Sequence, residues 1–176
     1  MTTEYLIRRE MEHVLAALTP SNRLVCRVCL QTGLRVGDVV SLRTADLARQ
    51  FWIVEAKTKK RRRVNLPDEL LGQLRAAAGA VWVFPGRNPD KHRTRQAVWA
   101  DVKRAARAFR IKQNVAPHSF RKVYAVEKLK ECGDIKRVQR ALNHSDCATT
   151  MIYVMAETLL AARQQKGRRV SASKLS

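Results

Sequence analysis

Apolar residues recur three and four positions apart along most of the 176-residue chain, a spacing typical of helices that bury one face. The pattern predicts a helix over about residues 3–18, a second over 20–33 and a short third one over 36–42. Thr19 can cap the second helix. Gly33 would end it, because glycine readily adopts the left-handed conformation found after the last helical turn.

The pattern changes in the second quarter of the chain, where short runs rich in β-branched and aromatic residues predict strands. The three candidate strands are 51–54, 63–66 and 81–84. A helix from Pro67 to about Ala78 separates the second from the third. We therefore expect an α+β, mostly helical fold with one small three-stranded antiparallel sheet.

Helical spacing returns after a polar loop at 87–93, where Thr94 can cap a long helix. Its inward face would carry four apolar residues, Val98, Val102, Ala105 and Phe109. Pro117 precedes a further helix that would stop at Gly133, and Asp134 can cap the helix after it.

Neither an internal repeat nor a linker divides the sequence, and its length is that of one ordinary domain. We therefore predict a single domain over residues 1–166. Residues 167–176 are basic and rich in serine, which predicts a flexible tail.

The charge balance is strongly basic. Lysine and arginine number 35 against 15 aspartate and glutamate residues, which gives a formal net charge of +20. Such an excess is self-repulsive unless an anion lies near, so the expected partner is a polyanion such as nucleic acid. A ribosomal or histone-like protein could carry a similar charge, and charge alone says nothing about chemistry.

The sequence shows neither a run of about 20 apolar residues nor a signal-peptide pattern, so we expect a cytoplasmic protein. The spacing of Cys26 and Cys29 suggests a metal or redox motif, but both lie in an apolar helical run. Cys132 and Cys147 do not form a second tight pair. We interpret Cys26 and Cys29 as buried thiols one helical turn apart, and we expect no metal site and no cofactor.

Two arginines, two histidines and a tyrosine form a constellation suited to chemistry at a phosphate: Arg35, His118, Arg121, His144 and Tyr153. His118 and Arg121 are three residues apart, so on a helix they share one face. Displacement at phosphorus needs a nucleophile, positive charge on the non-bridging oxygens and a proton for the leaving oxygen. Arginine suits the second task, because its planar fork binds two phosphate oxygens and stays charged.

Four segments in this order resemble the motifs of the tyrosine recombinases, also called the phage-integrase family. They are the first-arginine box at 32–39 with Asp38 as its acidic position, Lys57 in the basic hairpin, the H-x-x-R box at 118–121, and 142–153 with nine residues from His144 to Tyr153. The resemblance covers about residues 5–165. It implies the catalytic-domain fold of that family and a bacterial or phage-encoded protein.

The resemblance implies catalytic roles for six residues, Arg35, Lys57, His118, Arg121, His144 and Tyr153. Tyr153 would attack the scissile phosphate and form a 3′-phosphotyrosyl bond, while the arginines and histidines contact the non-bridging oxygens. Lys57 would protonate the leaving 5′-oxygen. Dividing one displacement into two easier ones in this way is covalent catalysis.

The sequence departs from the family pattern at two places. Asn143 stands where members usually carry glycine before the second histidine, and asparagine can keep the same left-handed turn. The hairpin lacks its usual glycine, so Lys59 or Lys60 remains an alternative to Lys57 as the general acid. His144 could also cap a helix, and Tyr153 in another context would be a packed core residue.

Basic residues fill six of the seven positions 57–63. Such a run could be a solvated loop or a nuclear-localisation-like tract. On a hairpin beside an active site, we expect it to contact the DNA backbone, which gives affinity without reading sequence. The predicted DNA-binding residues are Lys59, Lys60, Arg61, Arg62 and Arg63.

Only 34 residues precede Arg35, too few for the N-terminal core-binding domain that most members carry. We therefore expect that domain to be absent, in either an isolated catalytic domain or a short member like the fimbrial-switch invertases. The expected partner is double-stranded DNA, bound by a homotetramer that exchanges C-terminal segments, with 156–163 as the donor. Without DNA the chain could be a monomer.

The leading functional hypothesis is a site-specific DNA recombinase of the integrase or invertase type. A non-catalytic DNA-binding regulator on the same fold is the first alternative, although a pure binder has no need for Tyr153 at this spacing. A type IB topoisomerase-like enzyme, which shares the chemistry but relaxes supercoils, is the second.

Overall fold

The computed structural model of the protein describes residues 8–142. The chain divides into two compact units, Met1–Tyr124 and Ala125–Ser176. The first unit holds most of the described elements, and helix α6 begins in the first unit and ends in the second. None of the helices in the described part of the chain is both long and apolar enough to span a membrane.

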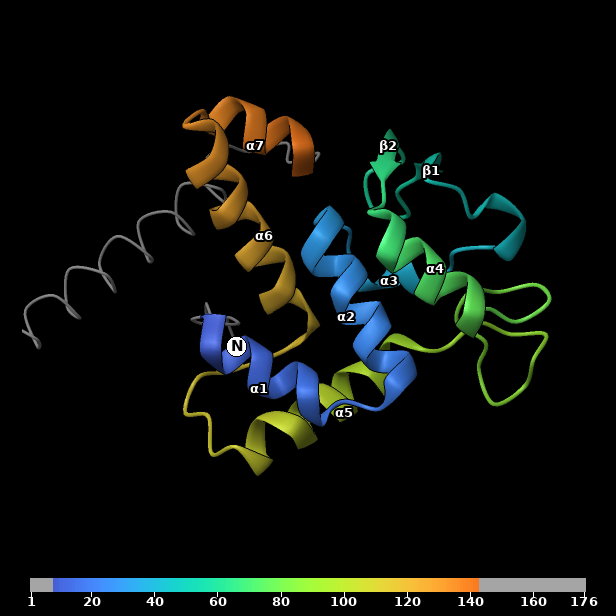
Figure 1. The fold of residues 1–176 in the computed structure, drawn as a ribbon, viewed down its shortest axis with the longest axis horizontal. Coiled ribbons are helices and arrows are strands. Elements are labelled where there is room, and N and C mark those ends of the chain that lie inside the picture. Colours follow the sequence, from blue (N-terminus) through green and yellow to red (C-terminus); the bar gives the residue numbers. More distant parts are fainter. Residues whose placement is uncertain (1–7, 143–176) are drawn as a thin grey trace, which may run out of the picture. The chain divides into compact units, whose positions relative to one another are not determined.

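The first unit consists of helices, one 3-10 turn and one hairpin (Figure 1). In chain order they are α1 (Arg8–Ala17), α2 (Pro20–Thr32), α3 (Val36–Val40), a 3-10 turn (Thr44–Asp46), β1 (Gln50–Val54), β2 (Arg61–Asn65), α4 (Asp68–Ala77), α5 (Arg95–Ala108) and the start of α6 (Pro117–Cys132). Helix α2 is central, because it packs against α1, α3, α4 and α5.

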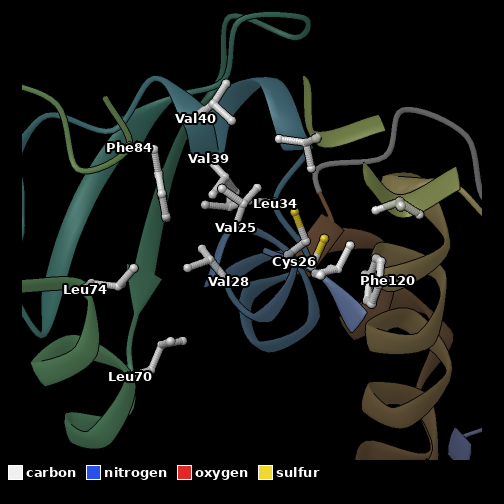
Figure 2. Packing of buried hydrophobic residues seen from close by; sticks show 14 of the residues in the cluster. Val25, Cys26, Val28, Leu34, Val39, Val40, Leu70, Leu74, Phe84 and Phe120 are labelled. Atoms are coloured by element: carbon white, nitrogen blue, oxygen red, sulfur yellow. The ribbon is translucent and has the colours of Figure 1, made fainter. Parts of the chain in front are cut away.

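The core of the first unit surrounds α2. Figure 2 shows side chains of α2 and of the turn after it lying between Leu70, Leu74 and Phe84 on one side and Phe120 on the other. Cys26 and Cys29 are fully buried, as predicted. Burial raises the pKa of both thiols, to about 12 for Cys29, which keeps them protonated at neutral pH.

The sheet has two strands within the described residues, so the prediction of three strands was wrong. Strands β1 and β2 form an antiparallel hairpin in which Gln50 faces Asn65 and Val54 faces Arg61. The third candidate, 81–84, pairs elsewhere. Its backbone contacts the segment before the 3-10 turn, where the Val83 amide donates to the Leu42 carbonyl oxygen at 3.0 Å. These contacts extend no further than an isolated bridge, because the segment meets a turn and not a strand.

Several predicted helix ends are confirmed. Gly33 follows α2 with a φ of 65°, and its amide donates to the Cys29 carbonyl oxygen. The Thr94 hydroxyl accepts from the Ala97 amide at 3.1 Å and caps α5. Phe109, by contrast, was wrongly predicted to face inward: it lies just past α5, is 45% exposed and stacks on His13 with ring centroids 5.0 Å apart.

Thr19 does not cap α2 with its side chain. Its hydroxyl and its amide both donate to Asp101 Oδ2 in α5, at 2.8 and 2.9 Å, and the Asn22 amide group donates to the same oxygen. Arg104 donates to the other oxygen, Oδ1. Asp101 therefore joins the start of α2 to α5 through a carboxylate that is 8% exposed.

The described part of the second unit contains the end of α6 and helix α7 (Ile135–Leu142). Gly133 separates them with a φ of 63°. Asp134 caps α7 as predicted, because its Oδ1 accepts from the amides of Lys136 and Arg137 at 2.8 and 3.3 Å.

Candidate active site

Arg35 is presented by the sharp turn between α2 and α3. Gly33 adopts the left-handed conformation that ends α2, and Arg35 immediately precedes the first residue of α3. Its Nη1 donates to Glu55 Oε2 at 2.7 Å. The turn thus delivers a guanidinium that is oriented from the hairpin side by a carboxylate.

Helix α6 supplies two further predicted residues from its first turns, His118 and Arg121. Arg121 is only 1% exposed, and its Nη1 donates to the Gly33 carbonyl oxygen. Burial lowers its pKa to about 10, helped by the nearby charges of Arg35 and Arg62. Arg121 therefore remains charged at neutral pH, close to the turn that carries Arg35.

These elements enclose a cleft of about 500 Å³ in the first unit. Its walls come from the turn after α2, the hairpin and the starts of α5 and α6, with eleven lining residues: Leu34, Arg35, Val36, Gly37, Asp38, Ala56, Lys57, Arg95, Pro117, His118 and Arg121. The structure thus brings four of the six predicted catalytic residues to one cleft. The other two, His144 and Tyr153, lie outside the described residues.

His118 lines this cleft. Partial burial lowers its pKa to about 4, and the positive charges of Arg121, Lys122, Arg35 and Lys57 act in the same direction. The imidazole is therefore neutral at pH 7 in the absence of an anion. These four cations surround the imidazole with positive potential, which also favours binding of a phosphate.

The turn that carries Lys57 is held on both sides. The amide of Ala56 donates to Asp38 Oδ1 of α3 at 2.9 Å, and the Thr58 hydroxyl donates to Glu55 Oε2 at 2.8 Å. The Lys59 amide closes the turn on the Glu55 carbonyl oxygen at 2.9 Å. Lys57 lines the cleft, whereas the alternatives Lys59 and Lys60 are not among its lining residues, which favours Lys57.

Strand alternation divides the basic run of the hairpin. Arg61 and Arg63 are exposed, and the Arg61 guanidinium lies 5.2 Å from the centre of the Trp52 ring. Arg62 instead shares the inner face of β2 with Val64, because residues two apart on a strand point the same way. Its side chain is 9% exposed and contacts protein acceptors. Contact of these residues with DNA stays a prediction.

Two residues of the site escaped the sequence analysis. Glu55 is fully buried and accepts hydrogen bonds from Arg35, Thr58 and Arg62. Burial works to raise its pKa, but these hydrogen bonds and the two arginine charges outweigh it, so the pKa lies below its ordinary value. The signal in the sequence was an acidic residue at the edge of a strongly basic run.

The second overlooked residue is Arg95, which adds another cation to the cleft from the first position of α5. Its side chain passes so close to Gly37 that a Cβ there would lie 3.2 Å from Arg95 Cδ. A glycine in the first-arginine box therefore leaves room for the stem of a second arginine. The signal in the sequence was an arginine directly after the capping Thr94.

Comparison with known proteins identifies the family of the chain. The sequence pattern described as "Phage integrase family" matches residues 4–158. A tyrosine recombinase XerD of Rhizobium meliloti is 35% identical over 133 residues, which cover 69% of this chain and 43% of the relative. A putative integrase/recombinase of Sinorhizobium fredii is 31% identical over 157 residues, covering 85% of this chain and 51% of the relative. The chain thus spans about half the length of these relatives.

Solved structures share the fold. A lambda integrase dimer bound to a COC′ core site superposes with a TM-score of 0.74 at 18% identity, covering 86% of this chain and 59% of that one. The catalytic domain of bacteriophage HP1 integrase gives a TM-score of 0.68 at 22% identity, covering 88% and 89%. With the sequence match over most of its length, the chain belongs to the phage integrase family.

Proposed function

We propose that this protein is a site-specific DNA recombinase that cleaves and rejoins DNA through a 3′-phosphotyrosyl intermediate. The observation that carries the proposal is the meeting of Arg35, Lys57, His118 and Arg121 at one cleft. These residues come from three separate segments of the chain. Their convergence creates a pocket for a single anion with several donors already in place.

In the proposed reaction, the Tyr153 hydroxyl oxygen attacks the phosphorus and loses its proton as the new bond forms. The bond from phosphorus to the 5′-oxygen breaks, and Lys57 gives that oxygen a proton. Arg35 and Arg121 neutralise the non-bridging oxygens, where charge develops, and His118 and His144 donate beside them. The 5′-hydroxyl of another strand then attacks the phosphotyrosine, so the high-energy ester is conserved and Tyr153 is regenerated.

The hairpin would add affinity for the duplex. Lys59, Lys60, Arg61 and Arg63 are exposed on or beside β2, where they can contact phosphates. Such contacts release counterions and make binding depend steeply on salt, but they carry no sequence information. The proposed partner is therefore double-stranded DNA in general, with sequence selection made by other contacts.

We further propose that residues 1–166 form the catalytic domain of a homotetramer on DNA, with segment 156–163 exchanged between protomers, and that it works in the cytoplasm. The solved lambda integrase is a DNA-bound dimer, which supports an assembly of more than one protomer. Strand exchange between two duplexes requires four cleavages, one for each strand. Four protomers would supply one nucleophile for each.

A covalent selection tests the proposal on many candidate target sequences at once. Nicked duplexes with a randomised centre and a set of nick positions are incubated with the protein and a chelator. Cleavage just before a nick releases a short 5′-hydroxyl fragment, so the protein–DNA adduct accumulates. Adducts are isolated under denaturing conditions and their DNA is sequenced. We expect enrichment of one sequence with the wild-type chain and no adduct with Tyr153→Phe.

The other outcomes separate the alternatives. Duplex binding without any adduct across the pool would refute the proposal and favour a DNA-binding regulator. An adduct that survives in Tyr153→Phe would place the nucleophile elsewhere. Relaxation of a supercoiled plasmid that carries the enriched sequence, with no recombinant product from two such plasmids, would favour a topoisomerase-like activity.

A further inference from the structure

Two charged residues of the hairpin are turned into the protein. Glu55 directly follows β1 and is fully buried, and Arg62 in β2 has a side chain that is 9% exposed. Burying charge is costly unless the charges are paired and hydrogen-bonded. The hydrogen-bond partners of Glu55 and Arg62 therefore indicate what these two buried charges do.

Glu55 joins three segments through its two carboxylate oxygens. Oε2 accepts from Arg35 Nη1 at 2.7 Å and from the Thr58 hydroxyl at 2.8 Å. Oε1 accepts from Arg62 Nη1 at 3.3 Å. One carboxylate thus contacts Arg35 at the cleft, Thr58 next to Lys57, and Arg62 on the opposite strand of the hairpin.

Arg62 continues the connection toward α2. Its Nη2 donates to the Thr32 carbonyl oxygen, and its Nη1 lies 3.4 Å from the Gly33 carbonyl oxygen. Arg121 also donates to the Gly33 carbonyl oxygen. The turn after α2 therefore contacts the inward arginine of the hairpin and the buried arginine of α6 at the same atom.

We propose that Glu55 and Arg62 are positioning residues, which hold Arg35 and the turn bearing Lys57 in the geometry that receives the phosphate. The proposal rests on the recombinase function proposed above. Glu55 orients the Arg35 guanidinium through one oxygen and the lysine turn through the same oxygen. Arg62 holds that carboxylate against the end of α2. A displacement of Glu55 or Arg62 would therefore move both Arg35, which neutralises the phosphate oxygens, and Lys57, which protonates the leaving oxygen.

This inference changes the interpretation of the basic run. Arg62 binds protein acceptors in place of phosphate, whereas Arg61 and Arg63 face solvent on the same strand. Residues that touch phosphates and residues that position others produce different signatures. A lost phosphate contact weakens binding and lowers its salt dependence, whereas a lost positioning contact slows the reaction on DNA that is already bound.

The experiment uses the full chain and two measurements. The first is the rate of adduct formation at saturating concentration of the enriched nicked duplex. The second is the slope of log affinity against log salt for a short fluorescent duplex of fixed sequence. We expect Glu55→Gln and Arg62→Met each to lower the rate about 10- to 100-fold, because displacement of catalytic groups by about 1 Å has effects of that size. Their salt slopes should match that of the wild type.

Three further variants provide matched comparisons. Arg61→Met removes the same charge from the outward face and should reduce the salt slope by about 1. Arg75→Met removes an exposed charge from α4 and should leave both measurements unchanged. Thr58→Val keeps the shape of a half-buried turn residue and should slow adduct formation by less than Glu55→Gln does, which tests the bridge without removing a charge.

A wild-type rate in Glu55→Gln, or a salt slope reduced by about 1 in Arg62→Met, would overturn the inference. Thermal unfolding of each variant identifies any that fail to fold. In that case the rates of adduct formation of Thr58→Val and Arg62→Lys decide: slower rates support the inference, and wild-type rates overturn it. Failure of the recombinase proposal looks different, because the wild type itself would form no adduct. The salt slope of Arg62→Met would still report whether Arg62 touches phosphate.

Discussion

Two buried carboxylates in this chain hold arginine side chains, and their surroundings differ. Asp101 joins the start of α2 to α5, and its hydrogen-bond donors come from Thr19, Asn22 and Arg104. Glu55 accepts instead from one hydroxyl and two guanidinium groups, one of which belongs to Arg35 at the cleft.

The difference separates stability from chemistry. The donors to Asp101 lie where the start of α2 meets α5, and none of them lines the cleft, so we expect this carboxylate to act on stability. Glu55 holds a side chain that also faces the proposed phosphate site. We therefore expect Asp101, at the junction of α2 and α5, to affect stability, and Glu55, in the hairpin, to affect the reaction rate. Mutation of each residue should separate these two effects.

The largest effect should come from Asp101→Ala. Removing the carboxylate leaves the Thr19 amide and the buried Asn22 amide group without this acceptor, whereas Arg104 keeps the Ala17 carbonyl oxygen. Each buried donor left unpaired costs about 1–3 kcal/mol. Urea unfolding at neutral pH measures this loss. The rate of adduct formation per folded molecule should not change; a specific fall in that rate would break the contrast with Glu55.

Acid should weaken the same site. Burial works to raise the pKa of Asp101, but the hydrogen bonds from Asn22, Thr19 and Arg104 outweigh it and lower the pKa to about 2 from an ordinary 3.8. The unfolded chain therefore binds this proton first as pH falls. The stabilisation, about 2 kcal/mol, is complete above about pH 5 and is lost progressively as pH falls through about 2.

Urea unfolding at several pH values below 5, compared with Asp101→Asn, isolates this contribution. The variant should lack the part of the acid dependence that belongs to Asp101. Equal acid dependence in the two proteins would mean that the carboxylate is not held as the structure has it.

An intermediate effect is expected at the cleft, where His118 has a pKa of about 4 in the free protein. A bound phosphate would offset the charges of Arg121, Lys122, Arg35 and Lys57, and should raise that pKa by at least about one unit, equivalent to about 1.4 kcal/mol. Binding then takes up a proton, so affinity for DNA should rise as pH falls from 7 to 5.

Nuclear magnetic resonance of the His118 ring with and without a short duplex measures the pKa directly. Fluorescence anisotropy across the same pH range measures affinity, with His118→Gln as the control that should lose this part of the pH dependence. An unchanged pKa in the complex would place the phosphate away from the cleft.

The smallest effect is expected at Lys59, in the hairpin turn but outside both carboxylate networks. Its φ of 58° is a left-handed conformation that costs energy for any residue except glycine. Lys59→Gly should therefore stabilise the protein by about 0.5–1 kcal/mol, and thermal unfolding measures the change. Lys60→Gly is the matched control, because Lys60 has no positive φ and should gain nothing.

Local signals in the sequence predicted much of the fold. Gly33, Thr94 and Asp134 were identified as helix ends because each has a backbone or hydrogen-bonding preference that acts over a few residues. Thr19 was misjudged because its hydroxyl bonds to Asp101, 82 positions away. The third strand failed for a related reason, since its partner is a turn segment remote in sequence.

The site was predicted in the same uneven way. Arg35, Lys57, His118 and Arg121 lie in motifs, and the structure brings them to one cleft. Glu55 belongs to no motif that we recognised, and its importance depends on contacts from three segments. Such a residue becomes visible only when those segments are assembled.

The end of α2 has one further consequence. Its last carbonyl groups point at two guanidinium groups, through Thr32 to Arg62 and through Gly33 to Arg62 and Arg121. A helix carries the equivalent of about half a negative charge at this end. In the DNA-free protein, α2 thus acts as an internal counterion for the arginine cluster. The side chains are ordered during folding, so DNA meets a site whose loss of conformational entropy has already occurred.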